Sequence, residues 1–366
     1  MKRIIISVTS DLCTDQRVHK VATTLSEMGF DILLVGRKLP DSSLIERKYK
    51  TKRFKLLFNE EVWFYMEYNI RLFFFLLFSK VDVLLANDLD TLLPNFLVSK
   101  LKNKPLVYDS HEMFCEGPEL QDRTVVKLVW RAIEKTILPE IKYAYTVSQS
   151  IADAYKHQYG VDFRVNRNIP KLVKTTREVE QLNFEGKKII LYQGVMNPGR
   201  GLEEMIAAMP FIDDAVLLII GFGKVEGELK RLVKDKHLDD KVIFFGKVPF
   251  EDLLSYSIQA DVGLLLERSF GLSFTYALPN KLFDYIHAEL PIIASSLIEV
   301  KSIMQEYDIG KIAENHNPEY LAETVNEILS NNEKRKYWKQ NMQIAKKELN
   351  WEREQEKIRG VYAEFL

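Results

Sequence analysis

Residues 277–296, ALPNKLFDYIHAELPIIASS, hold a cation and a carboxylate at a spacing that suits a phosphorylated ligand. Their apolar pattern predicts a loop, then a helix that ends before Pro291, then a short buried strand. We expect Asn280 and Lys281 in the loop and Asp284 in the first helical turn. Loops that lead into helix N-termini hold anionic ligands in open α/β sheets, so this loop fits a ligand with both phosphates and hydroxyls. The alternative is that Lys281 and Asp284 form a solvated helix pair.

Two glycine-containing turns in the same half of the sequence also suit phosphate binding. Gly194 begins a turn that includes Arg200, and Gly221 and Gly223 form a second turn. Each turn follows a predicted strand and precedes a predicted helix. Glycine lets a backbone approach a phosphate closely, and a helix N-terminus offers free N–H groups. Each turn alone is a weak signal, because glycines also simply make tight turns.

Polar clusters follow two buried strands in the other half of the sequence. Asp88 and Asp90 come after one of these strands, and His111 and Glu112 come after the next. The carboxyl ends of parallel strands are where such sheets bind ligands, so these four residues are candidate site residues. A single histidine is more often structural, but its place in this polar cluster favours a site role.

Short apolar runs alternate with helical periods along the chain, which predicts an α/β protein with parallel sheets. The first unit of this kind has strands at 3–8 and 31–35 around a helix at 15–28. Further strands are predicted at 53–58, 81–86, 105–108, 143–147, 188–192, 215–220, 241–245, 262–266, 291–294 and 310–313. The first loop, 9–14, has no glycine, which disfavours a nicotinamide or flavin enzyme because the G-x-G-x-x-G fingerprint is missing.

A charged stretch without apolar periodicity, residues 171–186, divides the sequence. We therefore predict an N-terminal domain over 1–170, a linker over 171–186, a second domain over 187–349 and a final helix over 350–366. A chain of 366 residues is long enough for two domains of ordinary size.

Composition is that of a soluble globular protein, with 46% apolar and 28% charged residues. The formal net charge of -1 argues against nucleic acid as a partner. The two cysteines, Cys13 and Cys115, provide neither metal-ligand spacing nor a disulfide framework. The first residues read as a strand rather than a signal peptide, so we expect a cytoplasmic setting.

Residues 62–78, VWFYMEYNIRLFFFLLF, are dense in aromatic side chains. Glu67, Asn69 and Arg71 interrupt them, and a membrane span needs about 20 apolar residues. We favour a helix buried against the sheet. The alternative is a helix that touches a membrane surface or a lipid-linked substrate.

Taken together, these segments resemble the retaining, nucleotide-sugar-dependent glycosyltransferases of family four, which have the GT-B fold. The resemblance covers nearly the full length and rests on seven stretches in the family's order. They are 15–18 (DQRV), 87–92 (NDLDTL), 108–112 (YDSHE), 194–201, 220–223 (IGFG), 245–249 (FGKVP) and 278–296.

The resemblance implies two Rossmann-like domains with parallel sheets that face each other across a cleft. The N-terminal domain would bind the acceptor and the C-terminal domain the nucleotide sugar, with the final helix crossing back to the first domain. No metal or other cofactor is implied. Asp284 takes the place of the glutamate that binds the ribose hydroxyls, and Arg200 takes that of the basic residue on the diphosphate.

The other implied site residues divide between donor and acceptor sides. On the donor side they are Gly194 near the diphosphate or sugar, Gly221 and Gly223 at the second glycine turn, Lys247 and Val248 by the base, and Asn280 and Lys281 by the distal phosphate and sugar. His111 takes the place of the histidine beside the transferred sugar, with Asp88, Asp90 and Glu112 on the acceptor side. Catalysis is assigned to His111, Arg200 and Lys281.

The sequence departs from the family pattern at two points. The family often has two glutamates with seven residues between them, but here the second is Asp284 and the position of the first, eight residues earlier, is Tyr276. Glu267 is the nearest earlier carboxylate, so either it reaches the sugar or that contact is absent. A second basic residue often follows the first glycine, and here Val195 stands there.

The resemblance predicts transfer of a sugar from a UDP or GDP sugar to a hydroxyl of a saccharide or lipid-linked saccharide, with retention. Bacterial surface polysaccharide or lipopolysaccharide synthesis is the expected pathway, in the cytoplasm or at the inner face of the membrane. The alternatives are a nucleotide-sugar 2-epimerase of the same fold and a non-catalytic nucleotide-sugar-binding protein.

Overall fold

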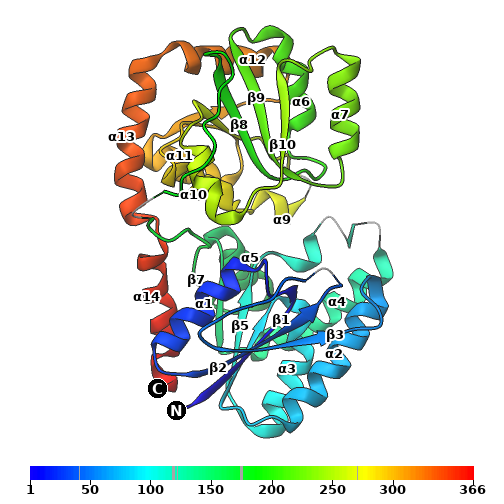
Figure 1. Ribbon diagram of the computed structural model, residues 1–366. Helices are drawn as coiled ribbons and strands as arrows, with labels where there is room; N and C mark the ends of the chain where they lie inside the picture. The colour runs from blue at the N-terminus through cyan, green and yellow to red at the C-terminus, as the bar shows by residue number, and fades with distance from the viewer. Residues whose placement is uncertain (41, 118–119, 122, 174–175, 270) are drawn as a thin grey trace. The chain divides into compact units, whose positions relative to one another are not determined.

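The chain forms two compact units, each built on one parallel sheet. The computed structural model describes residues 1–366 except 41, 118–119, 122, 174–175 and 270. The first unit contains Met1–Asn168, Gly271–Ser273 and Arg353–Leu366, and the second contains Ile169–Phe270 and Phe274–Glu352. Figure 1 shows the helices that flank each sheet.

The first unit has a seven-stranded parallel sheet with the order β3-β2-β1-β4-β5-β6-β7. Its strands are β1 (Arg3–Asp11), β2 (Asp31–Lys38), β3 (Lys50–Lys55), β4 (Val83–Asn87), β5 (Leu106–Ser110), β6 (Tyr143–Thr146) and β7 (Arg164–Val165). The order reverses at β1, which pairs with β2 on one side and β4 on the other. Ligands of such sheets bind beyond the carboxyl ends of the strands near this reversal.

Helices cover both faces of this sheet (Figure 1). They are α1 (Gln16–Glu27), α2 (Glu61–Phe78), α3 (Leu89–Lys102), α4 (Thr124–Ile137), α5 (Gln149–Tyr159) and α14 (Trp351–Tyr362). Asp15 and Ser148 cap the N-termini of α1 and α5, because each side chain accepts a hydrogen bond from a backbone N–H of the first turn. The C-terminal helix α14 packs beside α1, where Arg359 pairs with Glu27.

The aromatic segment forms α2, but only one face of this helix is buried. Phe64, Tyr68, Leu72 and Leu76 point into the unit, at the spacing of one helical stripe. The expectation of a buried helix is therefore correct for that stripe and wrong for the opposite side, whose apolar side chains are exposed. No helix in the described part of the chain is long and apolar enough to cross a bilayer.

The second unit has a six-stranded parallel sheet with the order β10-β9-β8-β11-β12-β13. Its strands are β8 (Lys188–Val195), β9 (Ala215–Phe222), β10 (Val242–Gly246), β11 (Val262–Leu265), β12 (Ile292–Ser295) and β13 (Gly310–Ala313). Numbered from β8, this is the order 3-2-1-4-5-6 of a doubly wound nucleotide-binding sheet.

Alternate residues of β8 enter two different cores, because both faces of the second sheet are covered. Ile190 and Tyr192 belong to one core, and Ile189 and Leu191 belong to the other. The helices are α6 (Leu202–Ala208), α7 (Glu226–Asp235), α8 (Leu253–Ser257), α9 (Leu272–Thr275), α10 (Asn280–His287), α11 (Ile298–Tyr307), α12 (Pro318–Ser330) and α13 (Asn332–Glu348). A strand that is covered on both faces has apolar residues at consecutive positions, and the sequence of β8 shows this pattern.

The predicted α/β architecture with two parallel sheets is confirmed, with local corrections. Strand β1 continues to Asp11, so the first half of the predicted loop 9–14 is strand. Strand β3 lies three residues earlier than predicted. Helix α10 begins at Asn280, so Asn280 and Lys281 lie in its first turn instead of a loop, and Asp284 lies one turn further on.

Gly221 is a position where the sheet itself requires glycine. Its φ is +149°, and a Cβ placed on it would lie 1.9 Å from the carbonyl oxygen of Gly194 on the neighbouring strand. We expect Gly221→Ala to lower the free energy of unfolding by about 2 kcal/mol or more, because the two backbones would have to separate.

Urea denaturation of the variant provides the measurement. The matched control is Gly227→Ala in α7, where a Cβ would meet nothing within 4 Å and a helical alanine should be neutral or stabilising. Equal stability of the two variants would contradict the close approach of β8 and β9.

Candidate functional site

Three charged side chains converge beyond the carboxyl end of β11 in the second unit. Glu267 is 1% exposed, and its Oε1 lies 2.9 Å from Lys281 Nζ and 3.3 Å from Arg200 Nη1. Lys281 lies in the first turn of α10, and Arg200 lies just before α6, so the starts of two helices place the two cations beside one buried carboxylate. The structure thus brings together three residues that lie 67 and 14 positions apart in the chain.

This cluster keeps unused hydrogen-bonding capacity. The Lys281–Glu267 contact is an ion pair without hydrogen-bond geometry, and the buried Oε2 of Glu267 has no partner in the described structure. Lys281 Nζ also lies 4.0 Å from the centroid of the Tyr192 ring. Buried polar atoms in folded proteins are nearly always paired, so this arrangement can accept a ligand that offers both an anion and a hydroxyl donor.

Gly194 and the second glycine turn lie beside these cations. A Cβ on Gly194 would lie 3.8 Å from Lys281 Cε, and Gly194 pairs in register with Gly221. At Gly223 a Cβ would meet the carbonyl oxygen of Met196 at 2.2 Å. The glycines therefore serve close backbone packing at the strand ends, and Gly194 places no side chain beside Lys281.

Asp284 is held by a polar network that the sequence did not reveal. Its Oδ2 accepts a hydrogen bond from Gln193 Nε2 at 3.2 Å, and Gln193 Oε1 accepts one from Ser257 Oγ at 2.6 Å. Gln193 is 3% exposed and immediately precedes Gly194. The only available signal was a polar residue at the end of an apolar strand. A carboxylate fixed in this way suits recognition of vicinal hydroxyls.

The alternative of a solvated Lys281–Asp284 pair is wrong. The side chain of Lys281 is 10% exposed and pairs with Glu267. Asn280, next to it, is exposed at the start of α10.

An exposed aromatic ring stands at the end of β9. Phe222 is 50% exposed and pairs in register with Val195, which is also exposed. Lys247 Nζ, from the loop after β10, lies 5.1 Å from the centroid of the Phe222 ring. Val248 packs against the core beneath. The sequence analysis named Lys247 and Val248 as site residues but did not name Phe222. The position of Phe222 between Gly221 and Gly223 was the one sequence feature that could have indicated its role.

In the first unit, His111 lies between two carboxylates. Its Nδ1 is 3.0 Å from Asp88 Oδ2, and its Nε2 is 3.3 Å from Asp109 Oδ2. The backbone N–H of His111 also donates to Asp88 Oδ1 at 2.7 Å. Burial works to lower the pKa of His111, but the charges of Asp88 and Asp109 outweigh it and hold the pKa well above its usual value.

A buried ion pair fixes Asp109 beneath His111. Arg17 of α1 is 3% exposed, and its Nη2 and Nε bond the two carboxylate oxygens of Asp109 at 2.6 and 3.1 Å. Arg17 Nη1 also donates to the carbonyl oxygen of Asn166. Burial would raise the pKa of Asp109, but the charges of Arg17 and His111 hold it below the usual value. Sequence reasoning quoted both residues within motifs and gave neither a role.

Asp90 and Glu112 differ in their surroundings. Asp90 is 7% exposed and accepts a hydrogen bond from Thr9 Oγ1 at 2.5 Å. Burial and the nearby charge of Asp88 raise the pKa of Asp90 to about 7. Glu112 is exposed, and its backbone carbonyl accepts hydrogen bonds from Ser110 and Tyr155. Asp88, Asp90 and His111 thus form one charged group, with Glu112 at its border.

Comparison with protein families gives two adjoining matches. Residues 15–177 match the family described as Glycosyltransferase Family 4, and residues 174–344 match the family described as Glycosyl transferases group 1. Together the two matches run through both units of the structure.

Similar proteins and structures agree with these matches. The chain is 28% identical over 196 residues to spore coat protein SA of Bacillus subtilis, which covers 50% of each chain, so the aligned region spans about half the length of that relative. The structure is similar to sucrose-phosphate synthase of Thermosynechococcus elongatus, with a TM-score of 0.79, 18% identity and coverage of 100% and 99% of the two chains.

The structure is also similar to that of Anabaena HepE in complex with UDP, with a TM-score of 0.77, 14% identity and full coverage of both chains. At these identities the two structural similarities establish the fold. The predicted GT-B type is thereby confirmed.

The raised pKa of Asp90 predicts a pH-dependent stability. The folded protein keeps a proton on Asp90 between pH 3.8 and about 7, where the unfolded chain has lost it. The unfolded state therefore binds fewer protons, and this group makes the free energy of unfolding fall as pH rises through that window, by about 1.4 kcal/mol per unit at most. Asp90→Asn should lack this contribution.

The measurement is urea denaturation of both proteins at several pH values. Their difference in stability should move steadily in favour of Asp90→Asn as pH rises from 4 to 7. Titrating groups that do not interact with Asp90 are shared and cancel, so the difference reports Asp90 together with the charges coupled to it. A difference that stays constant with pH would show that Asp90 titrates alike in folded and unfolded chains.

Proposed function

Because the chain belongs to the GT-B glycosyltransferases of the family 4 type, we propose that it transfers a sugar from a nucleoside diphosphate sugar to a hydroxyl acceptor with retention of configuration. The acceptor that we propose is a saccharide or lipid-linked saccharide of the kind used in bacterial surface polysaccharide or lipopolysaccharide synthesis. The proposed setting is the cytoplasm.

The observation that carries this proposal is the convergence of Arg200 and Lys281 on Glu267. Two cations and the glycine-lined backbone beside them suit a diphosphate. Asp284, one turn further along α10 and fixed by Gln193, suits the ribose hydroxyls. Diphosphate and ribose are adjacent parts of one ligand, and α10 supplies a group for each.

The catalytic task is stabilisation of the leaving group. Negative charge grows on the diphosphate as the bond to the sugar breaks, and preorganised cations lower the energy of that state. Arg200 and Lys281 perform this role in the proposed reaction, and we propose that no metal is needed. The unpaired Oε2 of Glu267 accepts a hydrogen bond from a sugar hydroxyl, which is the contact that Tyr276 cannot make.

His111 is the proposed group for the transferred sugar. Its ring is oriented by Asp88 and Asp109, which suits a fixed hydrogen-bonding position beside a sugar oxygen. No protein nucleophile is assigned. The departing phosphate would itself help to deprotonate the acceptor hydroxyl.

The base is the proposed ligand of the loop after β10. Lys247 and Val248 lie there, and Phe222 offers a ring face beside Lys247. We propose UDP as the first nucleotide to test, because HepE of the same fold was solved with UDP. GDP is the second.

Thermal unfolding with UDP, GDP, ADP, CMP and NAD in parallel tests the donor site. We expect UDP to raise the melting temperature, because a ligand at about a hundred times its dissociation constant adds about 2.7 kcal/mol of stability. Asp284→Ala should abolish the rise. The matched control is Asp239→Ala. It removes an exposed carboxylate that precedes the amino end of β10, whereas the candidate site lies at the carboxyl ends of the strands. No rise with any nucleotide would contradict a donor site in the second unit.

Arg200→Ala tests the chemistry. We expect kcat to fall about a hundredfold or more, the usual effect of removing one group that stabilises transition-state charge, with a smaller loss of nucleoside diphosphate affinity. Arg268→Ala is the matched control, because Arg268 lies in the same region, is exposed and pairs with Glu204. A wild-type kcat in Arg200→Ala would contradict the mechanism. Product analysis by NMR identifies an epimerase, which would change the stereochemistry of the donor sugar without any acceptor and without a change of mass.

A further inference from the structure

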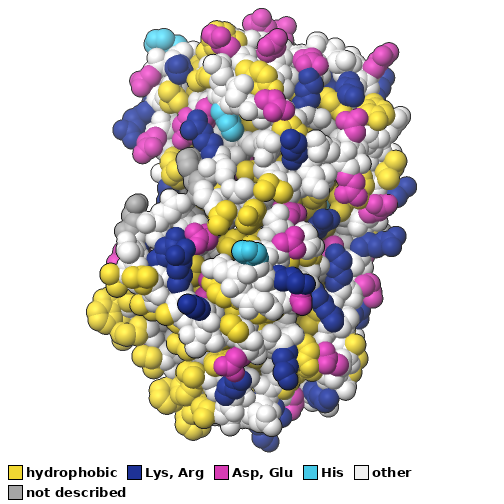
Figure 2. All heavy atoms as spheres, turned by 180° about the vertical axis from the view of Figure 1, so that it is seen from behind, with side chains coloured by type: hydrophobic (Ala, Val, Ile, Leu, Met, Phe, Trp, Pro, Cys, Tyr) yellow, Lys and Arg dark blue, Asp and Glu magenta, His cyan; other side chains and the backbone are white. Residues whose placement is uncertain are grey.

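The outer surface of three helices in the first unit is apolar and exposed. We call it the apolar face. It consists of Leu57, Phe58, Val62, Trp63, Met66, Ile70, Phe74 and Phe78 on and before α2, Leu97 and Leu101 on α3, and Val125, Leu128 and Val129 on α4. Figure 2 shows hydrophobic side chains gathered at the lower left, where these helices lie.

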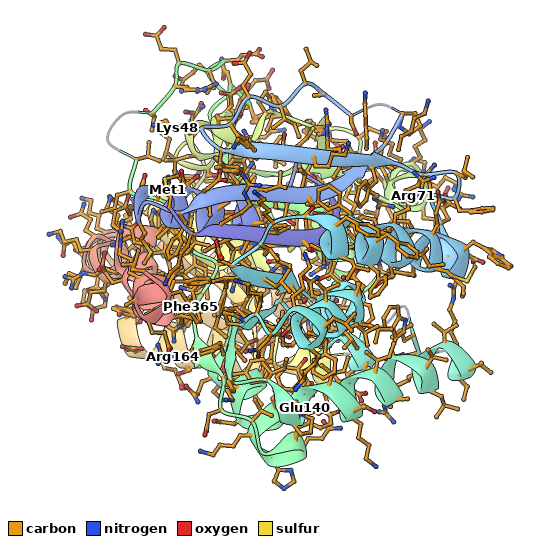
Figure 3. The ribbon with its side chains drawn as sticks, turned by 90° about the horizontal axis from the view of Figure 1, so that it is seen from below. Met1, Lys48, Arg71, Glu140, Arg164 and Phe365 are labelled. Atoms are coloured by element: carbon orange, nitrogen blue, oxygen red, sulfur yellow. The ribbon has the colours of Figure 1, made fainter. Side chains whose placement is uncertain are left out.

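The apolar face is one continuous surface. Tyr65 of α2 and Trp130 of α4 pack edge to face with ring centroids 5.4 Å apart, and Arg123 pairs with Glu61 at 2.9 Å. Helix α3 packs against both α2 and α4. In Figure 3, α2, on which Arg71 is labelled, projects side chains away from the sheet.

Packing of the unit itself does not require these side chains. On α2 the buried stripe is 64, 68, 72 and 76, and the exposed residues 62, 66, 70 and 74 lie on the opposite side of the same helix. Of the 27 exposed large apolar side chains in the described chain, 13 belong to this face. Such concentration marks a surface that binds something.

The elements that form and border the apolar face are basic. Strand β3 and helices α2, α3 and α4 together contain ten Lys and Arg but only four Asp and Glu, in a chain whose net charge is -1. Phe54 of β3 packs on Tyr68 and Phe75 of α2, so the basic strand borders the face directly. An anionic surface is the complementary partner.

Two polar residues inside α2, Glu67 and Arg71, lie on the flank toward this basic strand, whereas Asn69 donates to the carbonyl oxygen of Asp90 in α3. Glu67 accepts hydrogen bonds from the backbone N–H groups of Leu57 and Phe58, and Arg71 pairs with Glu67 and donates to the carbonyl oxygen of Lys55. The helix thus has an apolar outer side and a polar flank. A helix of this kind lies in the plane of a membrane interface.

We propose that the apolar face binds the surface of an anionic lipid bilayer, with α2 lying parallel to it. The exposed rings and aliphatic side chains enter the boundary between headgroups and acyl chains, and the exposed Lys52, Lys55 and Lys135 meet anionic headgroups. A second copy of this chain fits less well, because a twofold interface would place the same basic border against itself. The inference goes beyond the proposed function and does not depend on the donor.

Flotation of the wild-type chain tests the proposal. The vesicles contain either phosphatidylcholine alone or phosphatidylcholine with phosphatidylglycerol. We expect the protein to float with the anionic vesicles, to bind neutral ones about tenfold or more weakly, and to lose binding as salt is raised. Absence from both vesicle fractions would overturn the proposal, and so would equal, salt-independent binding to both.

A triple variant, Trp63→Ser/Phe74→Ser/Phe78→Ser, identifies the surface. It should reduce binding to anionic vesicles about tenfold or more with an unchanged melting temperature, because these side chains are exposed. The matched control is Phe211→Ser/Phe250→Ser/Tyr337→Ser, which removes three exposed rings from the second unit. Equal binding by the triple variant and wild type would overturn the assignment of the face.

Tryptophan fluorescence supplies an independent readout. Trp63 is 58% exposed, whereas Trp130, Trp338 and Trp351 are 8%, 1% and 1% exposed. A blue shift on adding anionic vesicles should therefore come from Trp63, and Trp63→Phe should remove the shift while binding remains.

Analytical ultracentrifugation tests the alternative that a second copy of this chain binds the apolar face. A dimer that the triple variant abolishes, without vesicle binding by the wild type, would overturn the lipid proposal in favour of a second copy.

Discussion

A parallel sheet that is covered by helices on both faces leaves only its strand ends for polar chemistry, and both units obey this constraint. The strands themselves are filled with apolar side chains, so charged groups collect where β5 and β11 end. In each unit a buried carboxylate, Asp109 or Glu267, occupies that place. A buried carboxylate that stays ionised needs a cationic partner, and each of these two receives one from the first turn of a helix: Arg17 in α1 and Lys281 in α10.

Much of the fold follows from the sequence, because each strand is an apolar run bounded by polar turns and each helix has its own period. The strand orders themselves do not follow from these patterns, because short right-handed crossovers allow several orders. The sequence could not predict that the outer side of α2 is exposed. This helix has apolar residues on both sides, so its sequence pattern does not distinguish the side that faces the core from the side that faces solvent. The end of β1 was misplaced for a related reason: Thr9 and Ser10 are polar residues within a strand.

The candidate site was predicted in part. Position along the chain identified Asp88, His111, Arg200, Lys281 and Asp284, since residues after parallel strands or at helix starts must lie near one edge of a sheet. The pairing of charges was not predictable, because Lys281 is three residues from Asp284 but folds onto Glu267. Supporting residues such as Gln193 and Arg17 were missed because their roles consist of contacts with residues 91 and 92 positions away.

The ion pairs of Glu267 have a consequence for the proposed reaction. In the free protein this carboxylate partly neutralises Arg200 and Lys281, so a diphosphate must compete with it for the same two cations. Separating these ion pairs costs the same free energy for the bound donor and for the departing diphosphate, so the competition lowers donor affinity without changing the barrier from the bound state. An interaction that is stronger in the transition state than in the ground state raises the rate, whereas uniform tightening would only raise affinity. A buried acid between two cations is therefore compatible with catalysis even though it opposes donor binding.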